Sequence, residues 1–137
     1  MAAITAAVNR QRKGIPKSRR FLMTNSITIP KGALVANVTA TGLVTNAVDT
    51  AGNPVVGVAA ETKVSGTGGA DWITVDYDAE WLFAATSITQ AMMGTAMEVV
   101  DNNTVDETAG AGNIVAGKLT EFVSTTLGWV YIPGLTF

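Results

Sequence analysis

The sequence contains no cysteine and no histidine. These absences exclude a disulfide framework, a cysteine-based zinc site, a Ser-His-Asp triad and an imidazole general base. No apolar run approaches the roughly 20 residues that a membrane-spanning helix needs, and no basic start precedes an apolar run as in a secretory signal. We therefore expect a protein that is neither exported nor membrane-bound. Its 137 residues suffice for one domain with its own core.

Charge is scarce and unevenly distributed. Only 15% of the residues are charged, and the formal net charge is -2. Seven of the nine basic residues lie in the first 31 positions, whereas no acidic residue precedes Asp49. From Gly32 onward, two lysines stand against eleven carboxylates. The chain thus divides into a basic arm, residues 1–26, and an acidic body, residues 27–137.

The arm combines like charges with Gly14 and Pro16, which predicts an extended segment that is ordered only against a partner. Three interpretations compete: a solvated terminus, a clasp on a neighbouring protein subunit, or a nucleic-acid contact. Direct nucleic-acid contact is disfavoured because Phe21 is the arm's only aromatic residue and the body is acidic. The candidate contact residues are Arg10, Arg12, Lys13, Lys17, Arg19 and Arg20.

The body has the pattern of an all-β protein, with short β-branched runs separated by Gly, Asn, Asp and Pro. This spacing predicts a compact barrel or sandwich of eight or nine strands rather than βαβ units. Strict alternation from Asp71 to Phe83 places apolar side chains on one face and mostly polar ones on the other. The expected strands are Ser26–Ile29, Ala33–Thr39, Leu43–Ala47, Val55–Ala60, Trp72–Tyr77, Trp81–Ala84, Ala96–Val100, Ile114–Glu121 and Trp129–Ile132.

One short helix is expected after the sixth of these strands. Ser87 and Gln90 have the spacing of a capping box, and Gly94 stands where a left-handed helix stop is favoured. The apolar residues Ile88 and Met92 between them predict about two helical turns packed on the body.

An internal repeat runs through the body at an offset of 60 residues. Ala51-Gly-Asn-Pro-Val-Val-Gly57 recurs as Ala111-Gly-Asn-Ile-Val-Ala-Gly117. Each copy leads through a turn to a strand that begins with tryptophan. The pattern predicts two related β units, with Gly57 and Gly117 marking a bulge or a close backbone approach in equivalent strands.

Groups able to carry chemistry are few. Asp76, Asp78 and Glu80 point the same way on a strand, but no further oxygen ligands accompany them, so a solvated face is favoured over a cation site. No acidic pair has the apolar setting that glycoside hydrolysis needs. We expect no enzyme and no catalytic, cofactor-binding or metal-binding residue. Trp72, Trp81 and Trp129 are interpreted as anchors of the core or of an oligomer interface rather than as sugar platforms.

Six short segments follow one another in a recognisable order along the body. They are Ile29-Pro-Lys-Gly32, Asn53-Pro-Val-Val-Gly-Val-Ala59, Trp81-Leu-Phe83, Glu98-Val-Val-Asp101-Asn-Asn103, Asn113-Ile-Val-Ala-Gly117 and Trp129-Val-Tyr-Ile132. This order resembles the head decoration, or cement, proteins of tailed bacteriophages, and the resemblance covers about residues 27–135. This chain adds the basic arm, and its Ala96–Val100 segment lacks the aromatic residue usual in the family.

This resemblance implies a compact β fold that forms trimers on the outer capsid surface of the virion, after synthesis in the host cytoplasm. It implies capsid stabilisation, in which the trimer binds the major capsid protein where subunits meet. The arm would then lie on an acidic groove of that partner, and the body would fold without residues 1–20. The alternatives are a head-fibre or tail adaptor, a nucleic-acid-binding β-barrel, and a carbohydrate-binding module with exposed tryptophans.

Overall fold

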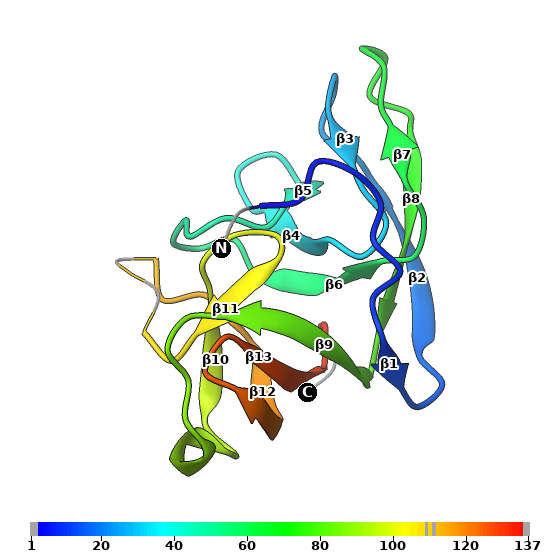
Figure 1. Ribbon diagram of the computed structural model, residues 1–137. Coiled ribbons are helices and arrows are strands. Elements are labelled where there is room, and N and C mark those ends of the chain that lie inside the picture. The colour runs from blue at the N-terminus through cyan, green and yellow to red at the C-terminus, as the bar shows by residue number, and fades with distance from the viewer. Residues whose placement is uncertain (1–2, 109, 111, 136–137) are drawn as a thin grey trace.

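The computed structural model describes residues 3–108, 110 and 112–135, and its regular structure is almost entirely β (Figure 1). The only helical element among the described residues is a single 3-10 turn, η1 (Gln90–Met92). The predicted all-β class is therefore confirmed. The strands are β1 (Arg12–Lys13), β2 (Lys17–Leu22), β3 (Thr28–Ile29), β4 (Leu34–Val38), β5 (Leu43–Asn46), β6 (Val55–Ala59), β7 (Lys63–Val64), β8 (Trp72–Tyr77), β9 (Ala79–Ala85), β10 (Ala96–Val99), β11 (Thr104–Asp106), β12 (Val115–Ser124) and β13 (Leu127–Ile132).

Five of these strands form a closed barrel, which we call the C-terminal barrel. Its hydrogen-bonded order is β9-β11-β10-β12-β13, and β13 returns to pair with β9. Closure leaves no edge strand open to other chains. The apolar cluster of this barrel includes the fully buried side chains of Phe83, Met97, Leu119 and Ile132.

The other main sheet has the order β2-β8-β6-β4-β5, and we call it the N-terminal barrel because its edge strands meet. Met23, directly after β2, forms a parallel bridge with Val44 of β5, and the Thr24 amide donates to the Val44 carbonyl at 2.9 Å. A second apolar cluster fills this barrel, with Met23, Val44 and Ile73 fully buried. A small two-stranded sheet of β3 and β7 extends from it.

The two barrels have the same strand pairing, which confirms the predicted repeat. The strands β2, β8, β6, β4 and β5 occupy the places of β9, β13, β12, β10 and β11. Lys17 pairs with Tyr77 as Ala79 pairs with Ile132, and the ladders of β4 with β6 and of β10 with β12 are interrupted by a bulge at equivalent positions. The repeat therefore begins at β2, inside the segment that composition assigned to the arm.

Two consecutive strands, joined end to end at a bend, connect the barrels. β8 and β9 are separated only by Asp78, whose φ of 63° lies in the left-handed region. The predicted alternation continues across this bend, because every second side chain from Ile73 to Ala85 is buried. β8 thus completes one barrel and β9 begins the other.

All nine expected strands are present with shifts of a few residues at their ends. The structure adds β1, β2, β7 and β11, which the sequence patterns missed. β1 and β2 were missed because their residues are mostly basic, and β7 and β11 because they are only two and three residues long.

The expected two-turn helix after β9 is wrong. The segment contains only η1, and its N-cap position is Thr89, which makes no side-chain capping bond. Ser87, the expected cap, has a φ of 51°, so it belongs to a left-handed turn instead. Gly94 does adopt the expected positive φ, at 83°. Ile88 is fully buried, and that single anchor replaces the expected helix face.

The N-terminal segment also differs from the expected free arm. β1 pairs with β9, β2 pairs with β8 along its whole length, and Met23 belongs to the core. In Figure 1 this segment, in blue, runs along the body to β1 and turns back into β2. A body without residues 1–20 would lose most of β2, so we no longer expect it to fold unchanged.

Gly57 and Gly117 lie at the predicted close approaches. A Cβ on Gly57 would overlap the carbonyl of Asp76, and a Cβ on Gly117 would overlap the carbonyl of Tyr131. Both contacts are to the strand that pairs next in the barrel. No flexible side chain can yield there, because the clash is with backbone.

Replacing Gly117 with alanine is expected to destabilise the protein by about 1–3 kcal/mol, since the backbone of β13 must shift to admit the methyl group. Gly68→Ala is the matched control, because a Cβ there meets no atom within 4 Å. Its stability should stay within about 0.5 kcal/mol of the wild type. Urea unfolding followed by tryptophan fluorescence measures both, and equal losses in the two variants would contradict the close approach.

Candidate functional site

Arg10 fixes the N-terminal segment to both barrels. Its guanidinium donates to the Gly32 carbonyl at 2.8 Å, the Leu82 carbonyl at 2.9 Å and the side-chain oxygen of Asn103 at 2.8 Å. The guanidinium carbon also lies 4.1 Å from the ring centroid of Phe83. Burial lowers the pKa of Arg10 to about 10, so the side chain remains charged at neutral pH. This residue is therefore a structural anchor and not a free contact residue.

Three more of the predicted contact residues stack on aromatic rings of their own chain. Lys13 lies 4.3 Å from the Trp129 ring, and Arg19 lies 4.8 Å from the Tyr77 ring. Arg20 lies 5.0 Å from the ring of Trp72. Cation–π contacts of this kind contribute about 0.5–1 kcal/mol each at exposed sites. The basic segment is thus attached to the body by its charges as well as by strand pairing.

Ion pairs engage two of the basic residues. Lys13 lies 2.7 Å from the Glu121 carboxylate, and Lys17 lies 3.5 Å from that of Asp78. Both pairs are exposed and contribute little stability. Arg12, on β1, is exposed and has no carboxylate within ion-pair distance among the described residues.

The three tryptophans have different surroundings. Trp81 and Trp129 are buried, at 3% and 9% exposure, whereas Trp72 is 44% exposed beneath Arg20. Trp81 belongs to the core cluster of the C-terminal barrel. Trp72 is therefore the tryptophan that offers surface to a partner.

The acidic row on β8 and β9 is hydrogen-bonded residue by residue. Asp76 accepts from Ser18, Asp78 accepts from the Tyr131 hydroxyl at 2.5 Å, and Glu80 accepts from Thr120. Across the described part of the chain, no three His, Cys, Asp or Glu side chains gather closely enough to hold a metal ion. In the same part of the chain, no helix has the length and apolarity to cross a membrane.

The Asp78–Tyr131 contact shifts both groups. The hydrogen bond from Tyr131 is the main cause that lowers the pKa of Asp78, and Lys17 adds to it. The same bond raises the pKa of Tyr131. Because Asp78 is the bend between the barrels, this bond fixes β13 of one barrel at the point where the other ends.

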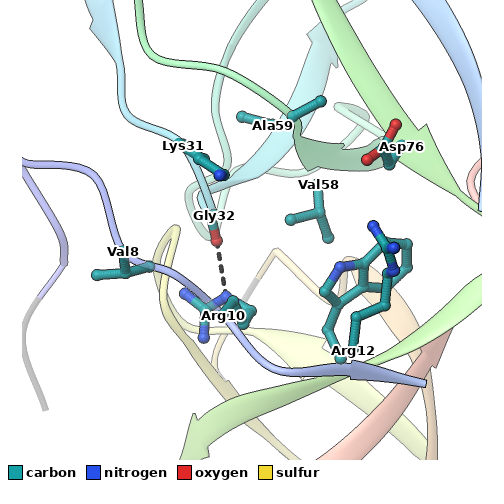
Figure 2. Close-up of a pocket in the computed structure, with 10 residues that line it drawn as sticks. Val8, Arg10, Arg12, Lys31, Gly32, Val58, Ala59 and Asp76 are labelled. Atoms are coloured by element: carbon teal, nitrogen blue, oxygen red, sulfur yellow. Dashed lines mark hydrogen bonds between the residues drawn. The ribbon is translucent and has the colours of Figure 1, made fainter.

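A hollow of about 170 Å³ opens where β1 crosses the junction of the barrels (Figure 2). Arg10, Arg12 and Lys31 surround it, and Asp76 is the carboxylate in its lining. Val8, Val58, Ala59 and Trp81 supply apolar walls. No sequence pattern predicts this site, because only the packing of the barrels brings its four separate segments together.

The turn between β1 and β2, which we call the tip, exposes an apolar side chain. Ile15 is 93% exposed, the highest value among the large apolar side chains described, and it lies between Lys13 and Lys17. The tip projects at the lower right of the molecule in Figure 1. A single exposed apolar side chain is common on protein surfaces, so Ile15 is available to a partner but does not by itself identify one.

A scan against protein-family models finds no match to this chain, and a search of curated proteins finds no similar sequence.

Replacing Arg10 with lysine is expected to lower the free energy of unfolding by about 2 kcal/mol, because an ammonium cannot reach three divergent acceptors. Arg12→Lys is the control, since Arg12 is exposed and its guanidinium does not bridge several acceptors as that of Arg10 does. Chemical denaturation distinguishes them. Comparable stability of the two variants would show that Arg10 is not the anchor.

Tyr131→Phe is expected to change the pH dependence of stability. Tyr131 stabilises ionised Asp78, so its contribution is present at neutral pH and disappears as the pH falls through the lowered pKa of Asp78. It also disappears as the pH rises through the raised pKa of Tyr131. The Tm difference from wild type should therefore be largest near neutrality and shrink at both extremes.

Tyr77→Phe provides the control for this measurement. The Tyr77 hydroxyl accepts a hydrogen bond from the guanidinium of Arg19, whereas the Tyr131 hydroxyl donates one to a carboxylate. The Tm difference of Tyr77→Phe from wild type should stay constant between neutral and acid pH. A Tyr131→Phe difference that is equally constant would refute the assigned contact.

Proposed function

We propose that this chain is a capsid decoration protein of a tailed bacteriophage. In this proposal it is a structural protein without enzymatic activity, and it binds the outer surface of the head as a trimer and stabilises contacts between major capsid protein subunits. The motif order along the body supports the proposal. Its glycine-valine segments lie on β6 and β12, the equivalent strands of the duplicated barrels.

The observation that carries the proposal furthest is the turn between β1 and β2. This tip places one strongly exposed apolar side chain between two lysines, on a segment that Arg10 holds rigidly against the body. A rigid apolar anchor with a charged rim is a common arrangement at protein interfaces. The contact surface is therefore narrower than a whole basic arm, because most of the arm's cations face their own chain.

The capsid surface that fits this tip would offer a small apolar pocket for Ile15, since Lys13 and Lys17 already pair with Glu121 and Asp78 of their own chain. Trimerisation would let three weak tips bind together and raise the apparent affinity well above that of one tip. This arrangement suits a protein that must hold capsomers under internal pressure without a large interface per subunit.

Cosedimentation of the purified chain with heads assembled without it tests the proposal. Wild-type chain should sediment with the heads, and Ile15→Asp should weaken binding at least about tenfold, because a buried isoleucine contributes roughly 1.5–3 kcal/mol. Val64→Asp is the matched control, since Val64 is another exposed apolar side chain, 67% exposed, on the separate two-stranded sheet of β3 and β7.

Absence of the wild-type chain from the pelleted heads would contradict the decoration role. Binding by Ile15→Asp at wild-type strength would instead contradict the assigned tip while leaving the role standing. Salt-sensitive binding to single-stranded nucleic acid, without binding to heads, would favour the nucleic-acid alternative.

A further inference from the structure

The hollow at the junction of the barrels has an excess of positive charge. Arg10, Arg12 and Lys31 line it against one carboxylate, that of Asp76. Among the described residues, none of the three cations lies within ion-pair distance of a carboxylate. Asp76 itself accepts a hydrogen bond from Ser18. The hollow therefore holds cationic groups whose charges are not balanced locally.

The side chains are arranged around one space. Figure 2 shows Arg10 below Gly32, Arg12 rising from β1 toward Val58 and Asp76, and Lys31 on the opposite side. Arg10 uses three of its five N–H donors on protein acceptors, all at 2.8–2.9 Å. It is thereby fixed in place, while Arg12 and Lys31 remain free to turn toward a ligand.

The lining of the hollow is mixed, with apolar side chains among the charged ones. Val58, Ala59 and Trp81 are buried residues of the two barrels, and Val8 belongs to the N-terminal segment. An inorganic anion can contact only the cations, whereas a carboxylate on a short aliphatic stem can also bury its methylene groups against the apolar part of the lining.

We propose that this hollow binds the carboxylate of a glutamate side chain from a partner protein, with Arg12 and Lys31 as its charged contacts and Arg10 as the fixed cation behind them. The volume of about 170 Å³ accommodates one such side chain and excludes a bulky ligand. The site is independent of the decoration role, because it requires only an acidic segment on whichever protein this chain meets.

Titration of the full chain with N-acetylglutamate N-methylamide, followed by NMR, tests the site. The resonances of Val58, Ala59 and the Trp81 indole should shift in a saturable way, with a Kd on the order of 1 mM for a ligand of this size. The isosteric glutamine derivative should produce no saturable shift. Sodium chloride at matched ionic strength serves as the blank.

Arg12→Gln and Lys31→Gln should each weaken binding about tenfold, the usual cost of losing a charge-assisted contact. Lys118→Gln is the control, because it removes one positive charge from β12, outside the hollow, and should leave the Kd unchanged. Arg10 is left intact because it holds the fold.

Several results would overturn the proposal. These are an absence of saturable shifts, equal shifts with the glutamine derivative, or an equal loss of affinity in Lys118→Gln. Tighter binding of inorganic phosphate than of the glutamate derivative would also refute it, since the hollow would then be a phosphate site. None of these results bears on cosedimentation with heads, so the two proposals fail separately.

Discussion

Closure of the N-terminal barrel is the constraint on which the rest of the structure depends. A five-stranded barrel needs a fifth strand to join its edges, and in the C-terminal barrel β9 fills that place. The equivalent strand of the first barrel is β2, drawn from the basic N-terminal segment. Without β2 the fully buried Met23 would lose its position beside Val44, and the sheet would keep two open edges. The basic N-terminal segment is therefore required for the fold, whether or not it also contacts a partner.

The duplicated strands keep their pairing and differ in chemistry. Arg19 of β2 occupies the position that Trp81 holds in β9, and Phe21 occupies that of Phe83. Trp81 is buried because β9 lies where the barrels meet, whereas Arg19 is exposed because β2 lies on the outside. On the outer strand the cation still finds an aromatic ring, that of Tyr77. Equivalent positions of β2 and β9 have the same strand register but different side chains, because one strand lies on the outside and the other lies between the barrels.

Sequence patterns were sufficient for the features that depend on local chemistry. Alternation located β8 and β9, and the repeated glycines Gly57 and Gly117 marked real backbone approaches. Sequence patterns failed where the structure of a segment depends on contacts with a part of the chain that is far away in sequence. Lys17–Leu22 looks like a solvated basic run until β8 and its aromatic rings are placed beside it. Ser87 and Gln90 have helix-cap spacing, yet burial of Ile88 holds the segment in a turn. Sequence patterns also missed the hollow, because its lining residues come from separate segments of the chain.

The exposed tip and the hollow belong to one rigid surface. Arg12 and Ile15 are three residues apart, hence within roughly 10 Å even if the chain is extended between them. β1 is paired with β9, and Arg10 ties it to Gly32 and Leu82, so little conformational entropy remains to be lost when a partner binds. A partner that buries Ile15 brings its neighbouring side chains to the hollow, where a carboxylate meets three cations. The basic residues thus have two roles. Most of them attach β1 and β2 to the barrels, whereas Arg12 and Lys31 remain available to bind an acidic side chain of a partner protein.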